Sequence, residues 1–156
     1  MASDTPIIMP LGESAVVVEF GSAISTELNQ QAVAFAVHIN ANQFAGFVEA
    51  VPAYASTTVF YDLAKVVREF ACFANGFEAV RSMLLDELSK VTSTINDAEN
   101  VVEIPAQFGG DGGPDLESVA SECGIDISNV IEIFLSRTYR VYMVGFLPSF
   151  AYMGDV

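Results

Sequence analysis

The clearest candidate for chemistry is a glycine-rich loop in the last third of the chain. It reads Gly109-Gly110-Asp111-Gly112-Gly113 and leads into Pro114-Asp115-Leu116, which predicts the start of a helix. Such a loop can hold a phosphate with backbone N–H groups. No Lys-Ser/Thr pair or GxGxxG spacing accompanies it, and Asp111 and Asp115 would repel an anion. A turn shaped for packing is the alternative, because glycine allows close approach of other groups.

Three carboxylates are candidates for acid–base chemistry, namely Asp62, Asp111 and Asp115. Asp115 is the candidate catalytic residue because it opens the helix that follows the loop. An acid at this position also stabilises the positive start of a helix, which is a purely structural alternative. If the loop binds a ligand, we expect Gly109, Gly110 and Gly113 to form the contacts.

The histidine and the cysteines form no catalytic or metal-binding pattern. His38 is the sole histidine and lies beside the apolar stripe of a predicted helix, without a nucleophile in its motif. Cys72 and Cys123 belong to no CxxC or Cys/His cluster. They predict reduced, buried thiols and no metal site.

Aromatic residues crowd the C-terminal run. They are Tyr139, Tyr142, Phe146, Phe150 and Tyr152, with Arg137 and Arg140 beside them. A cluster of this kind is typical of a core, and the alternatives are an interface or the wall of a ligand site. Phe146 and Tyr152 are the ligand-binding candidates from this run.

Composition and charge exclude several classes of protein and of binding partner. The 156 residues hold 20 acids and 6 bases, a net charge of −14, which repels nucleic acids and anionic membranes. The apolar share of 52% excludes ordinary disorder, and no apolar run reaches the roughly 18 residues that span a bilayer. The first four residues lack a basic region, so we expect no signal peptide and a cytoplasmic protein.

Hydrophobic periodicity predicts an α+β fold in which a sheet packs against two helices. The predicted order is β-α-β-β-α-β, with a domain boundary in the polar segment 96–100, so that the domains cover residues 1–98 and 99–156. The expected strands are two pieces within 9–20, then 46–51, 56–61, 101–104 and 139–145. The expected helices are 26–42, 76–90, 114–122 and 128–136. Phe77, Val80, Leu84, Leu85 and Leu88 form the expected buried stripe of the second helix.

Short motifs along the whole chain resemble one family when taken together. They are Pro10-Leu11-Gly12, Val18-Glu19-Phe20, Val51-Pro52-Ala53-Tyr54, Tyr61-Asp62, Ile104-Pro105, Gly109-Gly110, Gly113-Pro114-Asp115-Leu116, Tyr139-Arg140-Val141, Gly145-Phe146 and Phe150-Ala151-Tyr152. In order and spacing they resemble the family that contains the B subunit of 5-oxoprolinase, allophanate hydrolase subunit 1 and KipI, of the carboxyltransferase C and D subdomain type.

The resemblance implies a fold and a function. Residues 99–156 would begin a cyclophilin-like β-barrel that is incomplete here. The chain would then be a fragment, a natural truncation, or a protein that needs a partner to cover the exposed edge of its barrel. The leading function is a subunit of an ATP-dependent 5-oxoprolinase complex, inactive alone, with a second barrel-type subunit and a further catalytic subunit as partners. Alternatives are a KipI-type inhibitor of a histidine kinase and an allophanate hydrolase or urea carboxylase-type domain. Self-association into a homo-oligomer is also open.

Three departures from the family argue against an independent active site. Phe134 stands where relatives commonly carry a histidine, and Phe108 stands where they carry a tyrosine. Their Pro-Gly-Phe is Pro148-Ser149-Phe150 here, which replaces the residue most tolerant of a strained backbone. The downstream arginine set of the family lies beyond Val156.

Overall fold

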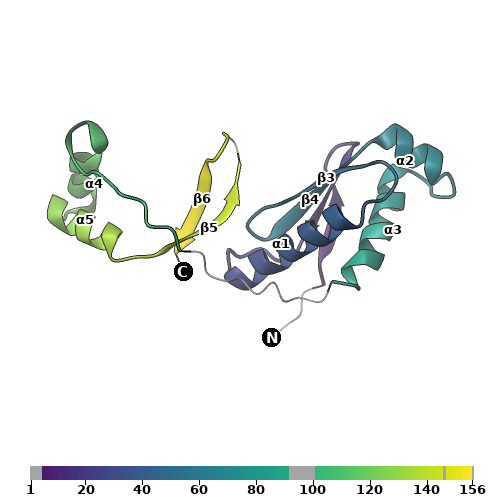
Figure 1. The fold of residues 1–156 in the computed structure, drawn as a ribbon, viewed down its shortest axis with the longest axis horizontal. Helices are drawn as coiled ribbons and strands as arrows, with labels where there is room; N and C mark the ends of the chain where they lie inside the picture. The colour runs from purple at the N-terminus through teal and green to yellow at the C-terminus, as the bar shows by residue number, and fades with distance from the viewer. Residues whose placement is uncertain (1–4, 92–100, 146, 156) are drawn as a thin grey trace. The chain divides into compact units, whose positions relative to one another are not determined.

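The computed structural model describes residues 5–91, 101–145 and 147–155, and Figure 1 shows the arrangement of its helices and strands. The strands are β1 (Ile7–Pro10), β2 (Ala15–Glu19), β3 (Phe47–Pro52), β4 (Ser56–Tyr61), β5 (Tyr139–Val144) and β6 (Ala151–Asp155). The helices are α1 (Thr26–Ala41), α2 (Leu63–Glu69), α3 (Gly76–Leu88), α4 (Leu116–Cys123) and α5 (Ile127–Leu135), with a 3₁₀ turn η1 at Gly110–Gly112. The predicted α+β class is confirmed, and the described residues form no closed barrel.

The first four strands form one antiparallel sheet in the order β1-β2-β4-β3. The register pairs Val16 with Val59 and Val18 with Thr57, so alternate residues point to the same face. These side chains are fully buried and join a core with residues of α1 and α3, including Phe35 and Leu84. The hydrophobic stripes of both helices therefore meet one face of the sheet, as the sequence predicts for α1.

The opposite face of this sheet, called the open face below, carries apolar side chains that remain exposed. As the strand registers require, it consists of Ile7, Met9, Ala15, Val17, Glu19, Glu49, Val51, Ser56, Thr58 and Phe60, of which Ala15 is buried. Ile7 is 58% exposed, Met9 41% and Val51 37%, whereas the core-face residues Val16, Val18 and Val59 are at 0%. The register of β3 shifts between Phe47 and Glu49, so Val48 is a bulged residue on this edge strand.

Several sequence predictions are wrong. Residues 101–104 do not form a strand: Val101, Val102 and Ile104 are at least 68% exposed. Leu85 lies outside the buried stripe of α3, since it is 41% exposed while Leu84 is at 0%. The periodicity of the sequence does not predict strand β6 or helix α2. The N-terminal cap of α2 is Asp62, whose side chain accepts a hydrogen bond from the Lys65 N–H at 3.0 Å.

The chain divides into two compact units, which are described separately. The first unit contains Met1–Asn96 together with Tyr142–Tyr152, and the second contains Asp97–Val141 together with Met153–Val156. The predicted domain boundary at residue 98 lies outside the described residues and stays a prediction. In the part of the chain that the structure describes, no helix is both long enough and apolar enough to cross a bilayer.

Candidate functional site

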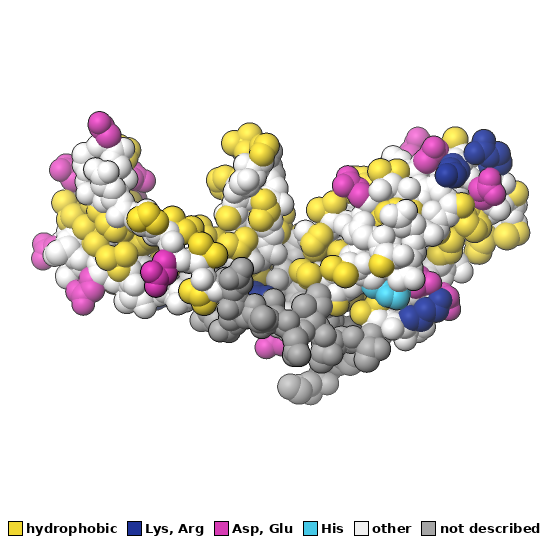
Figure 2. All heavy atoms as spheres, in the orientation of Figure 1, with side chains coloured by type: hydrophobic (Ala, Val, Ile, Leu, Met, Phe, Trp, Pro, Cys, Tyr) yellow, Lys and Arg dark blue, Asp and Glu magenta, His cyan; other side chains and the backbone are white. Residues whose placement is uncertain are grey.

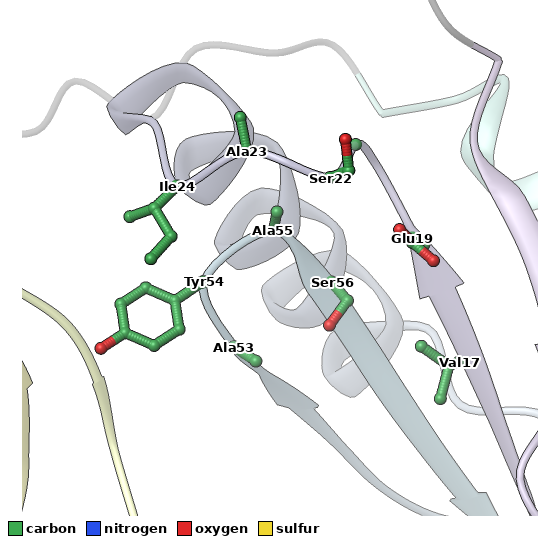
Figure 3. Close-up of a pocket in the computed structure, with 10 residues that line it drawn as sticks. Val17, Glu19, Ser22, Ala23, Ile24, Ala53, Tyr54, Ala55 and Ser56 are labelled. Atoms are coloured by element: carbon green, nitrogen blue, oxygen red, sulfur yellow. The ribbon is translucent and has the colours of Figure 1, made fainter.

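A groove of about 340 Å³ lies at one end of the open face, within the first unit (Figure 3). It is lined by the ends of β2 and β4 and by the two loops beside them. The lining residues are Val17, Glu19, Gly21, Ser22, Ala23, Ile24, Ala53, Tyr54, Ala55 and Ser56. Figure 3 shows Tyr54 and Ile24 on one side of the groove and Val17 and Glu19 on the other.

Local hydrogen bonds fix both loops of the groove. The β3–β4 turn is closed by the Ala53 N–H, which donates to the Ser56 carbonyl at 2.7 Å. The Phe20 N–H donates to the Ala55 carbonyl at 2.9 Å and so joins the end of β2 to this turn. On the other loop, Ser25 accepts from the Leu28 N–H at 3.2 Å and begins α1. Hydrogen bonds to backbone groups therefore hold both loops of the groove in place.

Glu19 is the one charged residue among those that line the groove. Its side chain is half-buried, and no described residue forms an ion pair or a side-chain hydrogen bond with its carboxylate. The remaining polar groups are the hydroxyls of Ser22, Tyr54 and Ser56. A groove with one carboxylate among apolar residues and hydroxyls suits a ligand that has a positively charged group on an apolar stem. Among the lining residues there is no histidine, lysine or cysteine to act as base or activated nucleophile.

An aromatic cluster continues from Tyr54. Its ring centroid lies 5.4 Å from that of Tyr142 and 6.4 Å from that of Tyr152, and Phe150 stacks edge-on against Tyr152 at 5.1 Å. Tyr152, which the sequence predicts as a ligand contact, thus lies in the same cluster as a groove residue. Phe146, the other aromatic candidate, lies outside the described residues.

Asn29 supports the same region, and the sequence does not single it out. Its side chain is 2% exposed, and its Nδ2 donates to the carbonyl oxygens of Ala53 and Tyr142, both at 3.0 Å. Both acceptors are far from Asn29 in the sequence, so the sequence alone does not reveal these hydrogen bonds. From helical periodicity, Asn29 is only a polar residue beside the apolar stripe of α1. The one available signal is that a polar residue at a buried helix position needs a partner.

The glycine-rich loop is a compact turn in the second unit. Gly109 and Gly110 have positive φ angles of 86° and 55°, and Gly113 is extended at −161°. The N–H groups of Gly112 and Gly113 donate to the carbonyls of Gly109 and Gly110 at 3.2 and 3.3 Å. A Cβ at Gly112 would lie 2.9 Å from the Gln107 carbonyl oxygen. These contacts support the packing alternative for the loop.

Asp115 precedes α4 and is exposed, and its side chain makes no capping hydrogen bond. Asp111 is also exposed, and neither carboxylate forms an ion pair among the described residues. The catalytic role of Asp115 and the ligand contacts of Gly109, Gly110 and Gly113 therefore stay predictions.

ATP does not fit the residues of this loop. Two of the N–H groups that would cradle a phosphate are used within the turn, and Asp111 and Asp115 flank it. Between Val91 and Ser136 the sequence contains no Lys or Arg to balance a triphosphate. A nucleotide at this loop would therefore need positively charged groups from outside this stretch.

His38 belongs to a polar link between α1 and α3. Its Nε2 lies 2.6 Å from Oε2 of Glu87, and Oε1 of Glu87 accepts from Nζ of Lys90 at 2.8 Å. Hydrogen bonds from Lys90 and then from His38 lower the pKa of the Glu87 carboxyl below its ordinary value of 4.5. This arrangement has no nucleophile, in agreement with the structural role expected for His38.

The two cysteines are free thiols, but both are exposed, so the prediction that they are buried is wrong. No group of three or more potential metal ligands gathers among the described residues. In the second unit, Phe134 stacks with Phe108 at 5.7 Å and with Tyr139 at 5.2 Å. Ser149 has a φ of 67°, the left-handed conformation for which relatives would use glycine.

Residues 6–156 match the family described as carboxyltransferase domain, subdomain C and D. The chain is 36% identical over 150 residues to the B subunit of 5-oxoprolinase from Bacillus subtilis, covering 96% of this chain and 62% of that protein. It thus spans less than two thirds of the length of this curated relative.

Two solved structures add to the comparison. The N-terminal domain of the histidine kinase inhibitor KipI from Bacillus subtilis is 32% identical, with a TM-score of 0.51, and the match covers 58% of this chain and 91% of that domain. The urea amidolyase of K. lactis is 14% identical with a TM-score of 0.64, over 97% of this chain and 10% of that one, and shows a shared fold. The predicted resemblance is confirmed: this chain belongs to the family of carboxyltransferase domains, subdomains C and D.

Proposed function

We propose that the chain acts as the B-type component of an ATP-dependent 5-oxoprolinase, in which water opens the lactam of 5-oxoproline to give glutamate. The observation that carries this proposal is the 36% identity to the B subunit of a 5-oxoprolinase across 96% of the chain. The partners are a second barrel-type subunit and a further catalytic subunit, in the cytoplasm.

The geometry supports a subunit that is inactive alone. The groove at Glu19 offers no base and nucleophile pair, and the glycine-rich loop lacks positive charge for a nucleotide. We infer that ATP binds to another component of the assembly. The exposed apolar residues of the open face favour association with other proteins.

The test is co-purification of the tagged chain with the two other subunit types, followed by an assay for glutamate from 5-oxoproline. We expect a stable mixed complex that releases glutamate only with ATP, and no turnover by the chain alone. Turnover by the isolated chain would disprove the inactive-alone proposal. A chain that joins no complex and leaves the assay unchanged would remove the oxoprolinase assignment.

A second candidate is inhibition of a histidine kinase, which rests on the likeness of 58% of this chain to the KipI N-terminal domain. Here the chain would lower autophosphorylation of a kinase without any chemistry of its own. Titration of the chain into an autophosphorylation assay distinguishes the two: a dose-dependent loss of kinase labelling supports inhibition, and constant labelling rejects it. The likeness to urea amidolyase supports the fold and adds no function.

A further inference from the structure

We propose that the open face binds a segment of a partner protein that inserts a Lys or Arg side chain into the groove at Glu19 and lays apolar side chains beside it. This binding goes beyond the oxoprolinase assignment, since it specifies a surface and the chemistry of its occupant whatever reaction the partner performs. The groove, the strand registers and the distribution of charge each support it.

The groove provides the recognition of the cation. Glu19 is a half-buried residue in a lining that is otherwise uncharged, and no described residue supplies a cation to pair with its carboxylate. The Tyr54 ring adds an aromatic wall, which attracts ammonium or guanidinium groups as well as alkyl chains. A cation that enters would pair with the carboxylate among otherwise uncharged lining residues.

The strand registers place apolar groups beside the cation site. Glu19 pairs with Ile7 of β1 and with Ser56 of β4, and the next row on the same face holds Met9, Val17 and Thr58, followed by Val51. Alternate residues of a strand lie about 7 Å apart, so this apolar row runs beside the acidic one. A partner segment with a basic and an apolar side chain about 7 Å apart matches both rows.

Charge selects a foreign, basic partner over a second copy of this chain. The chain carries only 6 basic residues, none of them in β1, β2, β3 or β4. Lys90, Arg68 and Arg81 already pair with acids of their own chain. Figure 2 shows few basic side chains on its visible face, mainly over α2 and near the end of α3, among more numerous acidic ones. A net charge of −14 further repels a second copy and attracts a basic segment.

The test measures binding of a fluorescein-labelled peptide, Ser-Arg-Ser-Leu-Ser-Ser, to the full chain by fluorescence anisotropy. Its arginine and leucine are two residues apart, so in an extended peptide they lie about 7 Å apart on the same side. We expect saturable binding, and about a fivefold or larger loss of affinity in Glu19→Gln, which removes the charge from the groove. The matched control is Glu27→Gln, which removes the same charge from the exposed first turn of α1 and should change affinity less than about twofold.

Two further arms identify what is recognised. Met9→Gln should lower the affinity for the peptide and leave the affinity for N-acetyl-arginine amide unchanged, because the small ligand does not reach the apolar row. Circular dichroism confirms that each variant is folded. Equal losses of peptide affinity in Glu19→Gln and Glu27→Gln would show that the peptide is attracted only by the overall negative charge of the chain, and would overturn the proposal. So would a complete lack of peptide binding, or N-acetyl-arginine amide binding as tightly as the peptide.

Discussion

The Asn29 side chain ties together segments that are far apart in the sequence. One amide nitrogen donates to the β3–β4 turn at Ala53 and to β5 at Tyr142, both at 3.0 Å. The bond to Tyr142 is buried, so no water replaces the amide there, whereas the bond to Ala53 is partly buried. The amide therefore positions Tyr54, which lines the groove, together with its ring partner Tyr142.

We expect Asn29→Ala to lower the free energy of unfolding by about 1–3 kcal/mol, because it leaves the buried acceptor of Tyr142 and the partly buried acceptor of Ala53 without the amide. Urea denaturation followed by circular dichroism measures the change. Gln31→Ala is the matched control, since Gln31 is an exposed amide on the same helix and should cost less than about 0.5 kcal/mol. Equal effects of the two substitutions would contradict the assigned role of Asn29.

The folding stability of the first unit depends on pH through the Glu87 carboxylate. Because its pKa is lowered in the folded chain, the carboxylate contributes stability that is present above its unfolded pKa, near 4.5, and is lost as pH falls through the lower folded value. We expect Glu87→Gln to reduce Tm at pH 7 and the gap from the wild type to shrink as the pH falls below about 4. Thermal melts across this range test the prediction against Glu49→Gln, an exposed acid on β3. A gap that does not change with pH would rule out linkage through Glu87.

Residue types alone predict only some of these features. The presence of Ser149 where the family motif has glycine indicates a strained backbone, and its φ of 67° agrees. The isolated position of His38 indicates a structural role. By contrast, the partners of Asn29 and Glu87 come from distant segments, and no local pattern can specify them.

At the scale of elements, Gly46 is the point where α1 gives way to β3 and where α2 packs closely. Its φ is +95°, and a Cβ there would lie 2.8 Å from Cγ2 of Val66 and 3.2 Å from the carbonyl oxygen of Asp62. The Gly46 carbonyl also accepts from the Asp62 N–H at 2.8 Å. Both the conformation and the space therefore require glycine.

We expect Gly46→Ala to cost about 2–4 kcal/mol in unfolding free energy, from backbone strain together with overpacking. Gly12→Ala is the control, because Gly12 also has a positive φ, +67°, but has no atom within 4 Å of the added Cβ. Its cost should be limited to the conformational strain, about 1 kcal/mol. Chemical denaturation of both variants decides whether space matters, and equal costs would remove the packing contribution.

Elements with strong periodicity are predicted correctly. The alternation of β4 and the apolar stripe of α1 indicate the right strand and helix, since each buries one regular face. The apolar run at 101–104 is misassigned, because a short β-branched segment resembles a strand whether or not a partner strand exists. Helix α2 spans only Leu63–Glu69, which is too short to show a clear period.

At the scale of the whole molecule, the first unit carries most of the core, and we predict that residues 1–91 fold alone. The match to the KipI N-terminal domain covers 58% of this chain and 91% of that domain, so a separate folding unit of about this size is expected. The fragment should unfold cooperatively but at lower denaturant than the full chain, because Asn29 and Tyr54 lose their contacts with Tyr142. Urea titration of both proteins tests this, and a broad, non-cooperative transition of the fragment would disprove it.

The edges of the four-stranded sheet carry a consequence for how this protein avoids fibrous aggregation. The outer strands are β1 and β3, and each ends in a proline, Pro10 and Pro52, which lacks the N–H that a further strand would need. The bulge at Val48 disturbs the ladder of β3 as well. Both features disfavour the addition of a further strand at either edge, and we expect them to limit edge-to-edge association of the folded sheet.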